Sequence, residues 1–247
     1  MSSSKHLCKA LILVLTVLVT GCHNNNNGGD DGPGGSSEPR VPLGSITSGH
    51  NFTVLAGSTV TNTGPSTVTG DLGPSPGTAV TGFFTVDGGP GAVSGTIYQG
   101  GLVAAQAQSD LTTAFNDAAG RPAGTSVSGN LGGQTLGPGV YTSTSALEIS
   151  SGDLTLDGLG NSNAVFIFQM ASSLTVTSGR QVILSGGARA SNVFWQVGSS
   201  ATLGTTSVFK GVILADQSIS MDTGASLEGR ALARVAAVTL DSNDIDP

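Results

Sequence analysis

The second half of the chain repeats short segments in which apolar and small polar residues alternate. Five such segments begin at Ala146, Ser173, Ser200, Ser218 and Ala237, with spacings of 27, 27, 18 and 19 residues. Alternation with a period of two predicts β-strands that bury one face. Recurrence at such a period is typical of a parallel β-solenoid, in which each repeat forms one coil.

Each coil is predicted to contain two further strands. A second short strand follows the alternating segment, as at 154–156, and an apolar third strand precedes it, as at 165–169. Glycine, serine and asparagine stand between the strands, as expected at corners. A similar pair of segments at 52–57 and 58–64 predicts one further coil, which makes six. We therefore expect a mainly β fold, a parallel solenoid with three faces.

The third face is apolar on both sides, so another element must cover it. Residues 101–120 contain an apolar stripe at helical spacing, made by Val103, Ala107, Leu111, Ala114, Phe115 and Ala118. We expect a helix over about 101–119 that ends at Gly120. Twenty helical residues span about 30 Å, and six stacked coils span ~24–29 Å. The helix is therefore predicted to lie along the solenoid axis, with Trp195 of the third face buried beneath it.

The first face is predicted to present short hydroxyl-bearing side chains to the solvent. Its candidate site residues are Thr59, Thr61, Thr63, Ser173, Thr175, Thr177, Ser200, Thr202, Ser218, Ser220 and Thr239. Glu148, Asp222 and Asp241 interrupt this surface. The second face differs, because it exposes charged residues such as Asp153 and Lys210.

Stacked strands place outward side chains on a grid, with about 4.8 Å between coils and about 6.7 Å between alternate residues. Both spacings are close to oxygen repeats on planes of hexagonal ice. Threonine holds a methyl and a hydroxyl group on a side chain of restricted rotation, so this grid could order water before contact with ice. Threonine is also a good strand residue in general, so threonine rows that bind no ligand are the competing interpretation.

Six stretches of the chain resemble the microbial ice-binding (antifreeze) protein family. They lie at 59–83, 110–121, 130–147, 164–169, 192–205 and 227–242. The resemblance extends over about residues 43–246. It implies a right-handed parallel β-solenoid of triangular cross-section, with one long α-helix packed along its axis and the N-terminal coil docked beside later coils. It also implies adsorption to ice crystals through a flat Thr/Ser-rich face, which gives thermal hysteresis and inhibits ice recrystallisation.

Residues 1–21 predict a lipoprotein signal peptide. Two lysines precede an apolar stretch that is too short to span a bilayer, and the sequence VTGC at 19–22 resembles the bacterial lipobox. The implied modification is a thioether-linked diacylglycerol on Cys22. Residues 22–42 are predicted to be a flexible tether, and 43–247 the ice-binding domain. We expect an exported protein, lipid-anchored to the outer membrane or cell surface; a plain secretory signal and a secreted protein are the alternative.

Charge excludes some partners. The chain has 9 Lys+Arg and 16 Asp+Glu, for a net charge of −7. Without Lys5 and Lys9 of the leader, 7 − 16 gives −9 for the mature chain. Binding to nucleic-acid phosphates needs a basic stripe, so we expect no nucleic-acid partner. Contact with the membrane is expected only through the lipid on Cys22, and the protein is expected to be a monomer.

Catalysis is not expected either. Cys8 leaves with the leader and Cys22 is acylated, so the mature domain would hold no thiol and no cysteine-based metal site. The acidic residues are scattered, and His50 is the one histidine after the tether. We therefore predict no enzyme activity, no metal and no cofactor. A membrane-anchored surface adhesin or a glycan-binding solenoid is the alternative function.

Overall fold

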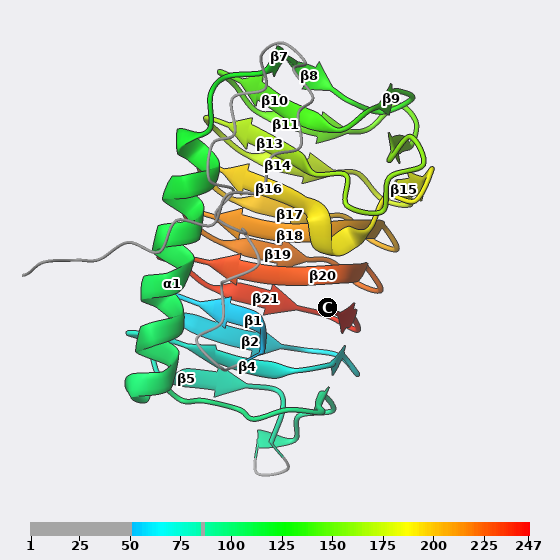
Figure 1. Cartoon of the computed structure of the whole chain (residues 1–247). Helices are drawn as coiled ribbons and strands as arrows, with labels where there is room; N and C mark the ends of the chain where they lie inside the picture. The colour runs from blue at the N-terminus through cyan, green and yellow to red at the C-terminus, as the bar shows by residue number, and fades with distance from the viewer. Residues whose placement is uncertain (1–50, 85–86) are drawn as a thin grey trace, which may run out of the picture. The chain divides into compact units, whose positions relative to one another are not determined.

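The computed structural model describes residues 51–84 and 87–247. The predicted signal peptide, Cys22 and the tether lie outside the described residues. The described residues form a stack of short parallel strands with a long helix beside it, as Figure 1 shows. This confirms the mainly β, parallel solenoid fold and its accompanying helix.

The first face is an eight-stranded parallel sheet, here called sheet B. Its strands in spatial order are β5 (Ala79–Thr81), β2 (Thr59–Asn62), β21 (Val238–Leu240), β19 (Ile219–Met221), β17 (Ala201–Leu203), β14 (Leu174–Val176), β11 (Leu147–Ile149) and β8 (Gly129–Asn130). All five alternating segments predicted from the sequence contribute a strand to it. The predicted number of coils was too low, because β5 and β8 add two rungs that the sequence pattern did not reveal.

The third face belongs to an eleven-stranded parallel sheet, here called sheet A. Its strands are β6 (Ala92–Val93), β3 (Thr67–Val68), β22 (Asp244–Asp246), β20 (Ser226–Ala233), β18 (Val208–Ala215), β16 (Val193–Val197), β13 (Phe166–Met170), β10 (Gly139–Ser143) and β7 (Thr125–Ser126), with β1 (Phe52–Ala56) pairing with β20 and with β4 (Asp71–Pro74). In addition, a short 3₁₀ turn at Ala190–Asn192 precedes β16.

The second face consists of two parts. At one end of the stack it is formed by a small separate sheet, here called sheet C, and at the other end by strands that continue sheet A. Sheet C contains β15 (Val182–Ser185), β12 (Leu154–Asp157) and β9 (Thr135–Leu136). The sequence predicted separate second and third strands, but in β18 and in β20 the two are one continuous strand. Each of these strands bends where the two faces meet, at Gly211 in β18 and at Gly229 in β20, and both glycines have positive φ. A Cβ atom at Gly229 would lie 2.0 Å from the Gly211 carbonyl oxygen, so this corner requires glycine.

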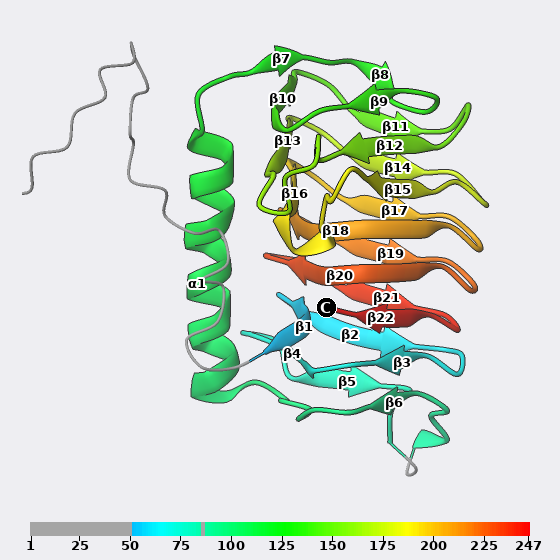
Figure 2. The same ribbon diagram turned by 45° about the vertical axis from the view of Figure 1, so that its right-hand side comes forward.

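The N-terminal coil docks beside the C-terminal coil, as the family resemblance implied. Val54 of β1 is in register with Ala231 of β20, and Thr61 of β2 with Thr239 of β21. Strands that are far apart in the sequence therefore lie side by side in the middle of the stack, as Figure 2 shows. The chain then continues away from this junction through β4 and β5.

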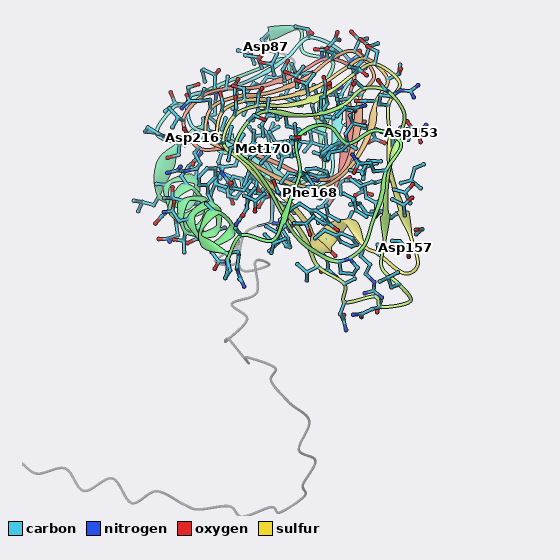
Figure 3. All side chains as sticks on the ribbon, turned by 90° about the horizontal axis from the view of Figure 1, so that it is seen from above. Asp87, Asp153, Asp157, Phe168, Met170 and Asp216 are labelled. Carbon is cyan, nitrogen blue, oxygen red and sulfur yellow. The ribbon has the colours of Figure 1, made fainter. Side chains whose placement is uncertain are left out.

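The interior of the solenoid is filled by apolar side chains from alternate strand positions. Figure 3 looks down the stack and places Phe168 and Met170 inside the ring of strands, with Asp153 and Asp157 on the outside of one face. Trp195 is fully buried in this interior, where its ring stacks on Phe168 at a centroid distance of 4.0 Å. The predicted place of Trp195 beneath the helix is wrong: the alternation turns Trp195 inward and the neighbouring Phe194 outward.

The helix α1 (Gly101–Gly120) covers the third face, as predicted. It packs against β1, β13, β16 and β18. Its buried residues are Ala104, Ala107, Leu111, Ala114, Phe115 and Ala118, whereas Val103 is only partly buried. They contact outward apolar side chains of sheet A, including Ile167, Phe194 and Leu232. Twenty residues span about 30 Å, and eight rungs span about 34 Å, so the helix runs along most of the stack.

Polar side chains also hold the helix to sheet A. Gln169 Nε2 donates to the carbonyl oxygen of Ala118 at 2.8 Å, where the last helical carbonyls have no partner within the helix. Gln108 Nε2 donates to the Ala233 carbonyl at 3.1 Å. The Arg234 guanidinium lies 4.5 Å from the centre of the Phe115 ring and forms an ion pair with Asp216. These contacts fix the position of the helix along the solenoid.

We predict that Leu111→Ala destabilises the protein, because Leu111 is fully buried between the helix and sheet A. The loss should be about 3 kcal/mol, as for other buried leucines, and the melting temperature should fall by about 6–12 °C. Leu102→Ala is the matched control on the same helix, since Leu102 is 91% exposed. Thermal unfolding followed by circular dichroism tests both; equal effects would contradict the observed packing of α1.

Candidate functional site

Sheet B is the face of the solenoid on which outward residues are mostly small and hydroxylated. Its inward residues, such as Leu174, Val176 and Ile219, are fully buried in the core. The residues between them point outward by strand alternation. The helix lies over sheet A and the ion pairs lie on other faces, so sheet B is the open, weakly charged surface of the molecule.

One row of outward residues crosses all eight strands in register. We call it the central column: in spatial order Thr81, Thr61, Thr239, Ser220, Thr202, Thr175, Glu148 and Asn130. Neighbouring members are separated by the strand spacing of about 4.8 Å. Six consecutive positions of this column, from Thr81 to Thr175, carry a hydroxyl group.

The hydroxyl groups of these six residues are available to the solvent. Thr81 and Thr239 are exposed and the other four are partly exposed. Within residues 51–84 and 87–247, none of the six side chains forms a hydrogen bond to another residue. Each hydroxyl can therefore both donate to and accept from water, which makes the column a row of evenly spaced water-binding groups.

A second row lies beside the central column at the start of the strands. It contains the predicted residues Thr59, Ser173, Ser200 and Ser218, and backbone hydrogen bonds join the last three in order along the stack. The Ser218 hydroxyl donates to the Ser200 hydroxyl at 2.9 Å, so this pair is partly satisfied within the protein. Ala237 stands between Ser218 and Thr59. The row is small and uncharged, but its hydroxyl groups are not continuous.

A third row, at the ends of the strands, is irregular. The predicted residues Thr63 and Thr177 lie here, and the Thr177 hydroxyl donates to the Ile149 carbonyl at 3.2 Å. Gly204, Asp222 and Asp241 occupy the positions between them. Sheet B therefore has one edge of small residues and one edge with two carboxylates, with the central column between the two edges.

Buried amide side chains hold the turns at this second edge. Asn243 Nδ2 donates to the carbonyls of Asp222 and Ala225, each at 2.9 Å. Ser66 Oγ donates to Asn62 Oδ1 at 2.6 Å and accepts from the Asn243 backbone N–H at 2.9 Å. These bonds connect the N-terminal coil to the C-terminal coil. They fix the strand ends on both sides of the junction, where Thr61 and Thr239 are neighbours.

The structure brings all eleven predicted residues to sheet B or to the positions that directly flank its strands, but it separates them into three rows. Sequence reasoning missed Thr81, which continues the central column beyond Thr61. The signal that could have found it is the similarity of the segment AVTG at 79–82 to VTNTG at 60–64, with which it pairs. Strand β5 contains only three residues, so its periodicity was too weak to assign.

The remaining surfaces offer different chemistry. On the second face, Lys210 pairs with Glu228 and Arg180 pairs with Asp153. Among the described residues, no group of three or more His, Cys, Asp and Glu side chains is arranged to hold a metal ion. Across the same residues, no helix combines the length and apolar character needed to cross a bilayer.

Known proteins share this architecture. The Ice-binding-like family matches residues 54–246. An ice-binding protein of Nostoc sp. (strain HG1) is 50% identical over 197 residues, which cover 79% of this chain and 71% of that protein. An ice-binding protein of Colwellia sp. is 40% identical over 206 residues, which cover 79% of this chain and 80% of that protein.

Solved structures agree with these relatives. The crystal structure of an ice binding protein from an Antarctic biological consortium superposes with a TM-score of 0.78 at 54% identity, covering 83% of this chain and 91% of that one. The ice-binding protein of the Antarctic ascomycete Antarctomyces psychrotrophicus gives a TM-score of 0.76 at 39% identity, covering 83% and 96%. The chain therefore belongs to the Ice-binding-like family.

Proposed function

We propose that this protein adsorbs to ice crystals through sheet B, with the six hydroxyl residues of the central column at the centre of the contact. Adsorption of this kind produces thermal hysteresis and inhibits ice recrystallisation. Family membership supports ice as the ligand. The choice of sheet B rests on one observation, the run from Thr81 to Thr175. None of its six hydroxyl groups forms a hydrogen bond to another residue in the described part of the protein.

The geometry of the column suits an ordered layer of water. Its members repeat every 4.8 Å or so, a distance close to an oxygen repeat of hexagonal ice. Five of the six are threonines, whose β-branched side chains have few rotamers when held on a strand. The methyl group disfavours disordered hydration while the hydroxyl fixes one water molecule. Because neighbouring strands keep the same register, water molecules bound at successive rungs would repeat with the same spacing as the strands.

The other two faces suit this role less well. The second face carries the Lys210–Glu228 and Arg180–Asp153 pairs, and each charged group imposes its own hydration geometry. The third face is covered by α1, so its strands are not accessible. Sheet B is therefore the face that combines regular spacing, accessibility and low charge.

We predict that Thr202→Tyr lowers thermal hysteresis by about fivefold or more, because a phenol projects beyond neighbours that are only about 4.8 Å away. Thr155→Tyr is the matched control: Thr155, like Thr202, is partly exposed and lies between two buried apolar residues, but on strand β12 of sheet C. Both variants should keep the melting temperature within about 2 °C, as is usual for surface substitutions. Hysteresis and ice etching of the purified soluble domain provide the measurement.

Two results would contradict this assignment. If Thr155→Tyr abolishes hysteresis while Thr202→Tyr does not, the second face is the binding surface. If the unaltered domain shows no hysteresis but binds glycans or cells, the protein is a surface adhesin.

We further propose that the protein is exported and anchored to the outer membrane through a lipid on Cys22. The support for this proposal is in the sequence, where a short apolar stretch is followed by VTGC at 19–22, which resembles the bacterial lipobox.

We predict that full-length protein expressed in a Gram-negative host incorporates radiolabelled fatty acid and fractionates with membranes. Cys22→Ser should lose the label completely, because the thioether can form only on that sulfur. Cys8→Ser is the control, since Cys8 lies within the leader and should not affect labelling. An unlabelled wild-type protein recovered from the medium would show that residues 1–21 form a plain secretory signal.

A further inference from the structure

The run of hydroxyl residues in the central column ends at a single residue. From Thr81 to Thr175 six hydroxyl residues follow one another without a gap, across strands β5, β2, β21, β19, β17 and β14. The next position, on β11, is Glu148, in register with Thr175. Beyond it lies Asn130 of β8.

Glu148 occupies the same structural setting as the threonine beside it. Leu147 and Ile149 on either side are fully buried and are in register with Leu174 and Val176, which flank Thr175. The Glu148 side chain is exposed and forms no hydrogen bond or ion pair with any residue that the structure describes. The fold therefore does not require a carboxylate at this position, and a threonine fits the same backbone and the same neighbours.

The last rung cannot extend the column in the same way. Asn130 Oδ1 accepts from the backbone N–H groups of Gly132 and Ser150, each at 2.9 Å. This side chain is folded back onto the turns and closes the end of sheet B. Glu148 is thus the single rung between the hydroxyl run and the closed end of the solenoid.

A carboxylate at this place acts against the proposed contact. A carboxylate binds its water strongly, so replacing or rearranging that water costs free energy. Asp222 and Asp241 are less disruptive, because they lie in the edge row. The Asp241 carboxylate also already accepts from the hydroxyls of Thr223 and Ser242. Glu148, in contrast, is in line with the threonines, and its exposed carboxylate accepts no hydrogen bond from any residue that the structure describes.

We propose that Glu148 sets the end of the ice-contacting array and limits the strength of adsorption. This inference rests on the proposed function of sheet B. One residue then determines the extent of the contact. With glutamate at position 148 the array has six hydroxyl rungs, and with threonine at this position it would have seven. Removing the charge and adding the hydroxyl should both strengthen binding.

The test is a gain of activity. In the soluble domain, Glu148→Thr should raise thermal hysteresis by about twofold at equal concentration, because it removes the cost of dehydrating a carboxylate and adds a rung. Glu148→Gln removes the charge without supplying the threonine geometry, so its gain should be smaller. Each variant should melt within about 2 °C of the parent protein.

Two controls separate this inference from simpler explanations. Asp246→Thr makes the same change of charge on β22, which continues the second face and is in register with Glu228, so it should leave hysteresis unchanged. If it raises hysteresis as much as Glu148→Thr, net charge is responsible and the inference is wrong. Thr202→Tyr reports on the proposed function itself. If that variant loses activity while folded Glu148→Thr is no more active than the parent, sheet B binds ice but Glu148 does not limit it.

Discussion

The parallel register between neighbouring coils is the constraint on which the rest of the structure depends. Every rung of sheet B pairs with the next in parallel register, and between β14 and β19 the inward positions that match are all apolar, as in the pairs Leu174–Ala201 and Leu203–Met221. A slip of one residue would exchange the buried and exposed sets. The inward apolar side chains therefore determine where the outward hydroxyls lie, and the regular spacing of the central column follows from the packing of the core.

This dependence explains which features the sequence could predict. Where alternation was strong, as at Leu174–Val176 and Ile219–Met221, both the strand and its outward threonine or serine were predicted correctly. The helix was predicted because its apolar stripe has the right spacing and its partner face needed a cover. The eleven predicted site residues do lie on sheet B or beside its strands, but only five of them belong to the continuous column.

The failures occurred where local pattern carries little information. Strands β5 and β8 are three and two residues long, so periodicity could not identify them. The direction of Trp195 depends on its register with Phe168, which is a tertiary contact. The fusion of second and third strands in β18 and β20 depends on the glycine corners at Gly211 and Gly229, which look like ordinary turn glycines in the sequence. Each of these features is set by a neighbour in the stack.

The position of the hydroxyl run within the stack has a structural consequence. Thr61 and Thr81 come from the N-terminal segment, whereas Thr239 and its neighbours come from the C-terminal half, so the run crosses the junction between two distant parts of the chain. At sheet B the two segments meet through the parallel pairing of β2 with β21, which are far apart in the sequence. The buried Asn62, Ser66 and Asn243 join the strand ends there, and α1 packs on β1 to one side of the junction and on β13, β16 and β18 to the other. Two sets of contacts thus align the two segments, and the regular spacing of the hydroxyl run across the junction depends on that alignment.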